Sequence, residues 1–110
     1  MLTPYAMMTS NVRRECERIA GKPPRALRQL AGRLGEKWHV TYSDGKWVLF
    51  AQVDENYYFT VTGGTTRRAK GPFQVVLWNG NRRTNVSEVD TRDGIIGVCK
   101  HMRPNFGEED

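Results

Sequence analysis

The sequence predicts an α+β fold, in which an N-terminal helical hairpin packs on an antiparallel sheet of about four strands and a short C-terminal helix follows. Apolar residues recur at helical spacing up to Gly35, and from Lys37 they alternate with polar residues, as they do in strands. The chain length is the third observation. Its 110 residues suffice for one α+β domain, which we place at 1–104, before an acidic tail at 105–110.

The first helix is predicted to begin at Thr3 and Pro4, which supply a capping oxygen and a favourable first helical residue. Its apolar stripe has spacings of 3, 4, 4 and 3 and consists of Tyr5, Met8, Val12, Cys16 and Ile19. Gly21 ends this helix, and Pro23 begins a second helix that ends at Gly35. The inner face of the second helix is expected to contain Leu27, Leu30, Ala31 and Leu34.

The sheet is predicted to begin with a hairpin whose two-residue turn is Asp44-Gly45, a typical type I′ sequence. This turn sets the register and places six residues on one face, which we expect to be the core face: Trp38, Val40, Tyr42, Trp47, Leu49 and Ala51. A two-residue connection to the next strand would bring Tyr58 and two threonines to this face. A three-residue connection at 54–56 brings apolar residues instead, and we prefer it: Tyr57, Phe59 and Val61.

Two basic loops, at 65–72 and 79–85, are predicted on either side of a fourth strand that runs from Phe73 to Asn79. The final helix is expected to be capped at Asp90. Its apolar residues at helical spacing are Ile95, Cys99 and Met102. Two glycines and several β-branched residues leave both helix and strand open for residues 91–102.

The chain carries a net charge of +5, and its positive charge is concentrated in two blocks. Residues 1–35 contain seven basic and two acidic groups, and residues 67–83 contain five basic groups and no acidic one. Of the 17 basic residues, 12 are arginines, whose planar fork suits phosphate and carboxylate groups. The composition therefore favours a polyanion or an acidic protein surface as the partner.

The candidate binding residues come from these blocks and from the sheet face opposite the predicted core face. Contacts with phosphates or with an acidic partner are predicted for Arg25, Arg28, Arg67, Arg68, Lys70, Arg82 and Arg83. The clusters before and after the fourth strand lie on the order of 20 Å apart, so they would contact separate phosphates. Stacking on unpaired bases is predicted for His39, Phe50 and Tyr58, provided that the C-terminal helix does not cover their face of the sheet.

No residue pattern typical of catalysis or metal binding stands out. The HExxH, paired CxxC, P-loop and GxSxG motifs are absent, so we expect neither an enzyme nor a cofactor. Cys16 and Cys99 are interpreted as core thiols, because with His39 and His101 they lack the close ligand pairs of zinc sites. No signal peptide and no long apolar run is found, which favours the cytoplasm over a membrane.

Two functional hypotheses are consistent with these residues. The first is a small non-enzymatic protein that binds the phosphate backbone of a nucleic acid with low sequence specificity. The second is a phage-type inhibitor or adaptor, such as an anti-CRISPR-like protein, which binds an acidic surface of a host nucleic-acid-processing protein. Composition does not separate DNA, RNA and protein as partners, and it leaves the oligomeric state open.

Overall fold

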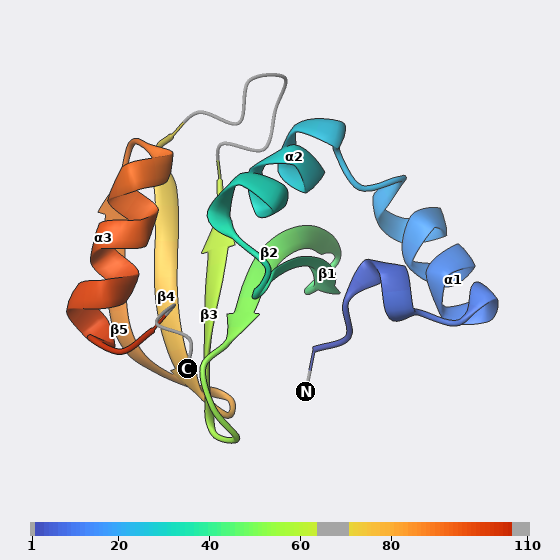
Figure 1. Ribbon diagram of the computed structural model, residues 1–110. Coiled ribbons are helices and arrows are strands. Elements are labelled where there is room, and N and C mark those ends of the chain that lie inside the picture. Colours follow the sequence, from blue (N-terminus) through green and yellow to red (C-terminus); the bar gives the residue numbers. More distant parts are fainter. Residues whose placement is uncertain (1, 64–70, 107–110) are drawn as a thin grey trace.

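A computed structural model describes residues 2–63 and 71–106 of the chain (Figure 1). Its elements are the 3-10 helix η1 (Tyr5–Met7), α1 (Ser10–Ala20), α2 (Arg25–Leu34), β1 (Trp38–Ser43), β2 (Lys46–Gln52), β3 (Tyr57–Thr62), β4 (Phe73–Asn79), β5 (Arg82–Val89) and α3 (Arg92–Met102). The five strands within these described ranges form one antiparallel sheet in sequence order. The predicted α+β class is therefore confirmed.

The register of the first two hairpins agrees with the sequence prediction. Asp44 and Gly45 form the first turn with positive φ angles of 52° and 77°, and the flanking residues pair as expected. In the second hairpin Leu49 lies opposite Val61, which fixes a three-residue connection at 54–56. Every residue assigned to the core face by the alternation is buried or packed against the core.

The sheet has a fifth strand where the sequence pattern predicts a basic loop at 79–85. Asn79 pairs with Arg82 across a two-residue turn, in which Gly80 adopts a positive φ of 62°. β5 lies at the edge of the sheet, and most of its side chains are exposed. An exposed edge strand needs few apolar residues, so the alternation that identifies the other strands is missing here.

The first helix begins later than predicted and contributes less to the core. The backbone carbonyl of Thr3 accepts a 2.6 Å hydrogen bond from Thr41 Oγ1, which holds this segment against β1. α1 begins only after Thr9, whose side chain caps it. Cys16 is the one buried residue of α1, and two members of its apolar stripe are half exposed: Val12 and Ile19. Because α2 and α3 already cover the sheet, α1 packs beside the β1–β2 hairpin (Figure 1).

The last element is a helix, and it starts one residue later than predicted. Thr91 caps α3 by accepting a 2.9 Å hydrogen bond from a backbone N–H three residues later. The predicted cap, Asp90, instead uses its backbone carbonyl to accept a hydrogen bond from the Gly71 N–H at 3.2 Å. This bond ties Asp90 to the chain that enters β4, outside the helix.

α2 and α3 cover one face of the sheet, which we call the inner face (Figure 1). The buried helix residues on this face are Leu27, Leu30, Ala31, Ile95 and Cys99. Phe106, which the sequence pattern assigns to the tail, is buried here. Its ring centroid lies 6.0 Å from that of Trp38 and 5.0 Å from that of Phe59. None of the helices in the described part of the chain is long and apolar enough to cross a membrane.

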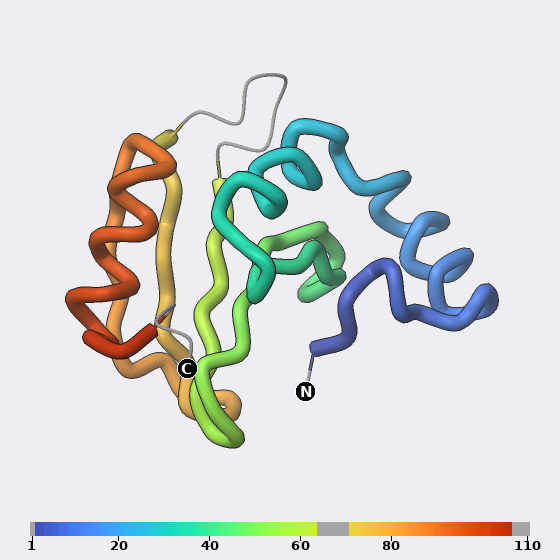
Figure 2. The backbone as a smooth tube through the Cα atoms, in the orientation of Figure 1, coloured from blue at the N-terminus to red at the C-terminus, as the bar shows by residue number. Residues whose placement is uncertain are grey.

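The opposite face of the sheet, which we call the outer face, is covered at one edge by the N-terminal segment and not by α3. Leu2 and Pro4 line a groove together with Phe50, and Thr41 bonds to Thr3 on this face. Figure 2 shows this segment running beside the strong bend of β1 and β2. Phe50 is accordingly only 4% exposed, whereas the outer face over β3, β4 and β5 carries accessible side chains.

Candidate nucleic-acid interface

Four outer-face residues form a row across β2, β3, β4 and β5, at the end of the sheet near the β4–β5 turn. The register places Gln52 opposite Tyr58, Tyr58 opposite Trp78, and Trp78 opposite Arg83. Side chains at directly paired positions lie on the same face of a sheet and contact one another. We call these four residues the stacking row.

The stacking row brings two aromatic rings and one cation into contact. The rings of Tyr58 and Trp78 are stacked, with centroids 6.1 Å apart and planes 8° from parallel. The guanidinium carbon of Arg83 lies 5.4 Å from the centroid of the Trp78 ring. Both aromatic residues are half-buried and Arg83 is exposed. The row therefore presents aromatic surface and positive charge together on one face of the sheet.

Hydrogen bonds hold both rings in position. The Trp78 indole N–H donates to Thr60 Oγ1 at 2.8 Å, and Thr60 is buried. The Tyr58 hydroxyl donates to the backbone carbonyl of Gly80 at 3.0 Å. Burial raises the pKa of Tyr58 above its ordinary value of 10.0, so the hydroxyl keeps its proton, and this hydrogen bond, at neutral pH. The rings are thus oriented before any ligand binds, which reduces the entropy lost on binding.

A bulge in β5 brings Arg83 to Trp78. Leu77 pairs with Asn85, whereas Trp78 pairs with Arg83, so Thr84 is an extra residue in β5. The Thr84 hydroxyl donates a 3.0 Å hydrogen bond to the backbone carbonyl of Leu77, which stabilises the bulge. In a regular ladder Thr84 would lie opposite Trp78, and the row would lack its cation.

A hollow of about 330 Å³ adjoins the stacking row at its Gln52 end and also contacts Tyr58. Its lining includes Gln52 from the row and two asparagines from neighbouring turns, Asn56 and Asn81. This volume lies within the range of small-ligand sites in proteins. Glu55 lines the same hollow, and its carboxylate disfavours an anionic ligand there.

The structure places the predicted stacking residues at different depths. Tyr58 belongs to the stacking row. His39 and Phe50 pair with each other in the adjacent row, with ring centroids 5.8 Å apart. His39 is exposed, but Phe50 is only 4% exposed, so its ring offers almost no surface to a ligand. Of the three predicted stacking residues, Tyr58 is therefore the one whose ring lies in the same row as an arginine.

The predicted basic residues do not form one surface. Arg82 and Arg83 follow the β4–β5 turn, and both are exposed. Arg25 and Arg28 are exposed on α2, in the helical layer on the opposite side of the sheet from Arg83. The remaining predicted contacts lie outside the described residues: Arg67, Arg68 and Lys70.

Trp78 is the residue of the site that sequence reasoning missed. The signal was present, because Phe73, Val75 and Leu77 alternate with Gln74, Val76 and Trp78 along the predicted fourth strand. Placing the first three on the core face puts Trp78 on the outer face. That Tyr58 is its neighbour follows only from the register between β3 and β4. The sequence at 63–72 predicts no particular turn type that would set this register.

Both cysteines are buried, as predicted, and both are free thiols. Burial raises the pKa of the Cys99 thiol to about 12, so this side chain is protonated and unreactive at neutral pH. Within residues 2–63 and 71–106, no three His, Cys, Asp or Glu side chains lie close enough together to hold a metal ion.

Comparison of this chain with protein families, with curated proteins and with solved structures finds no match. Its function is therefore inferred from its own side chains.

Proposed function

We propose that this protein binds single-stranded nucleic acid on the outer face of its sheet, with low sequence specificity. The observation that carries the proposal is the stacking row, in which two parallel rings and an arginine lie together on a sheet face. Proteins that bind unpaired strands on sheets combine these same features: aromatic side chains for the bases and cations for the backbone.

The stacking row favours an unpaired strand over a duplex. Duplex bases stack on one another, so their faces are not available to Tyr58 or Trp78. Unpaired bases expose their faces, and each base stacked on an aromatic side chain contributes about 1–3 kcal/mol to binding. Every base has such a face, so this contact discriminates weakly among sequences.

Arg83 supplies positive charge for a phosphate beside the row, whereas Arg82 pairs with Asn79 and therefore lies on the inner face. Each phosphate contact contributes about −0.7 to the slope of log affinity against log salt concentration for a single strand. The single contact at Arg83 therefore gives a slope of about −0.7. The α2 arginines lie on the other side of the sheet, so a strand on the outer face does not gain contacts from Arg25 or Arg28.

The test is a titration with labelled oligothymidylate and with a duplex, at about 50 mM and about 200 mM salt. Trp78→Leu should weaken single-strand binding by about fivefold or more, because it removes a stacking surface. Arg83→Gln should flatten the salt slope by about 0.7. Arg14→Gln is the matched control, because Arg14 is an exposed arginine on α1, and it should leave the slope unchanged.

Circular dichroism and urea unfolding establish that each variant is folded before its binding is compared. A folded wild-type protein that binds neither oligonucleotide at about 50 mM salt contradicts the proposal. Tighter binding to the duplex than to the single strand also contradicts it, because that result assigns the affinity to phosphate contacts alone.

A further inference from the structure

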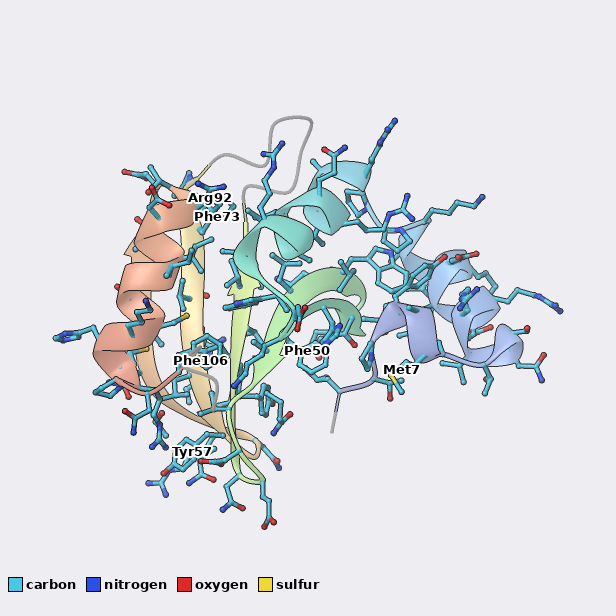
Figure 3. The ribbon with its side chains drawn as sticks, viewed as in Figure 1. Met7, Phe50, Tyr57, Phe73, Arg92 and Phe106 are labelled. Carbon is cyan, nitrogen blue, oxygen red and sulfur yellow. The ribbon has the colours of Figure 1, made fainter. Side chains whose placement is uncertain are left out.

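The hollow beside the stacking row lies at one end of the sheet and is lined by residues of two turns. Asn56 belongs to the turn between β2 and β3, and Gly80 belongs to the turn between β4 and β5. Figure 3 shows Tyr57, the first residue of β3, near this end of the sheet and Phe73, the first residue of β4, near the opposite end. A strand bound at the stacking row therefore passes directly beside the hollow.

Hydrogen bonds fix the two turns that form the hollow. The Asp54 side chain accepts hydrogen bonds from the backbone N–H groups of Asn56 and Tyr57, at 2.8 and 2.9 Å. The Gly80 N–H donates to the backbone carbonyl of Asn56 at 3.1 Å, which joins the two turns. The hollow therefore has its shape before a ligand binds, and binding costs less conformational entropy than it would in a flexible site.

The Tyr58 ring forms part of the wall of the hollow. One face of this ring stacks on Trp78, and the register places Gln52 on the other side of Tyr58. The second face of the ring is therefore turned toward Gln52, which lines the same hollow. A planar base in the hollow can stack on this second face, as unpaired bases do on other aromatic side chains.

The polar groups of the hollow combine acceptors with a donor. The Gln52 amide donates from Nε2 to the backbone carbonyls of Asp54 and Tyr57, at 2.6 and 3.3 Å, so its Oε1 keeps its capacity as an acceptor. Glu55 adds a carboxylate, which makes no ion pair within residues 2–63 and 71–106. The Asn81 amide supplies N–H donors. These groups suit an uncharged ligand that presents donors to the carboxylate and an acceptor to the amide.

Guanine is the base whose edge matches these groups. Its Watson–Crick edge carries two adjacent donors, N1–H and N2–H, with the O6 acceptor beside them. The two oxygens of a carboxylate accept from both donors at once. Adenine and cytosine have an acceptor beside a single donor group on this edge, and thymine and uracil have one donor between two acceptors. A carboxylate placed there therefore faces a lone pair of each of these other bases, which repels it.

We propose that the hollow binds one guanine of the strand, with its ring on the second face of Tyr58 and its two donors on the Glu55 carboxylate. The proposal rests on the proposed function, because the neighbouring bases must lie on the stacking row. It adds a preference at one position to a strand whose other bases are discriminated only weakly. The two ends of the row then have different roles, since Arg83 attracts a phosphate and Glu55 accepts hydrogen bonds from a base.

The test compares labelled decathymidylates in which one central base is replaced by guanine, hypoxanthine or adenine. Hypoxanthine lacks the 2-amino group of guanine and keeps N1–H and O6, so it offers the carboxylate one donor. We expect the guanine strand to bind about fivefold or more tightly than the hypoxanthine and adenine strands. Free guanosine should bind far more weakly than the guanine strand, because it makes no contact with Trp78 or Arg83.

Glu55→Gln removes the carboxylate from an exposed turn, so the core stays intact. This variant should bind unsubstituted decathymidylate at least as tightly as the wild type does, and its ratio of guanine-strand to hypoxanthine-strand affinity should fall to about one. Glu88→Gln is the matched control, because Glu88 is an exposed carboxylate opposite Gln74 that does not line the hollow. It removes the same charge and should keep the wild-type ratio.

The outcomes for this site differ from those for the stacking row. Equal binding of the guanine and hypoxanthine strands, by a protein that binds decathymidylate, overturns the guanine assignment and leaves the proposed function standing. Equal affinity ratios for Glu55→Gln and Glu88→Gln also overturn it. Free guanosine that binds as tightly as the guanine strand overturns it too and assigns the hollow to a nucleoside. A folded protein that binds none of the strands contradicts the proposed function and the guanine site together.

Discussion

Trp47 donates its indole N–H to the backbone carbonyl of Gly21 at 2.8 Å, which ties the connection between α1 and α2 to strand β2. The same indole makes edge-to-face contacts with Tyr5 and Tyr42, at centroid distances of 5.2 and 5.7 Å. Trp47 is 6% exposed. One buried side chain thus joins the N-terminal segment, the helical connection and the first hairpin.

Trp47→Ala is expected to lower the free energy of unfolding by about 3–5 kcal/mol, because it leaves a large cavity at this junction. Trp47→Phe keeps most of the packing and loses the hydrogen bond to Gly21, so it should cost about 1 kcal/mol for that bond and a similar amount for lost contacts. Urea unfolding measures both values. A loss below about 1 kcal/mol for Trp47→Ala would show that the ring is not part of the core.

The close approach of the Gly71 and Asp90 backbones predicts that a side chain at position 71 destabilises the protein. A Cβ atom added at Gly71 would lie 2.5 Å from Asp90 Cα and 2.7 Å from its carbonyl oxygen. Gly71→Ala must therefore displace backbone, and we expect it to destabilise the protein by about 1–3 kcal/mol. Thermal and urea unfolding check this value.

Gly32→Ala is the matched control for this substitution. Gly32 lies within α2, and an added Cβ there meets no atom within 4 Å. Alanine has the higher helix propensity, so Gly32→Ala should stabilise the protein by about 0.5–1 kcal/mol. Equal effects of the two substitutions would contradict the close approach at Asp90.

The first three strands could be predicted from sequence because two independent signals agree there. The Asp44-Gly45 turn fixes the register, and the alternation of Trp38, Val40 and Tyr42 fixes the face. The connection at 54–56 then follows, since only three residues keep the apolar positions of β3 on the same side. Turn residues and the pattern of buried residues both constrain this segment, so the register and the buried face of these three strands follow from the sequence alone.

The start of α1 and strand β5 could not be predicted, because long-range contacts decide them. Thr3 and Pro4 satisfy the rules for a helix start, but Thr41, distant in the sequence, bonds to the Thr3 carbonyl. β5 is stabilised by its ladder with β4, and its exposed side chains show no apolar pattern. The stacking row depends on the same ladder, and the bulge at Thr84 that brings Arg83 to Trp78 has no signature in the sequence.

Cys99 makes a prediction about pH. Burial raises the pKa of its thiol from an ordinary value of 9.0 to about 12. Below about pH 9 both the folded and the unfolded thiols are protonated, so this group does not change stability with pH. Between about pH 9 and pH 12 the unfolded thiol releases its proton and the folded one retains it, so stability falls as pH rises.

Urea unfolding of the wild type and of Cys99→Ala, at about pH 8 and about pH 10.5, isolates this effect, because the variant lacks the thiol and retains every other titrating group. The wild type should lose more stability than the variant over this interval, with a limiting slope of about 1.4 kcal/mol per pH unit for one proton. Equal losses would show that the Cys99 thiol ionises as readily in the folded protein as in the unfolded one.

Removing the hydrogen bond between Trp78 and Thr60 should separate the contribution of base stacking from that of charge in the proposed interface. Thr60→Val keeps a β-branched side chain of similar size in β3 and removes the acceptor of the 2.8 Å bond that orients the indole. We expect a loss of about 1–3 kcal/mol in stability and weaker oligothymidylate binding, because the Trp78 ring is no longer held parallel to Tyr58. No charge changes, so the slope of log affinity against log salt concentration should equal that of the wild type, whereas Arg83→Gln changes the slope.

Thr62→Val is the control on the same strand and face, and it should leave oligonucleotide binding unchanged. A salt slope altered by Thr60→Val, or equal binding losses for both threonine variants, would contradict the role given to the oriented Trp78 ring.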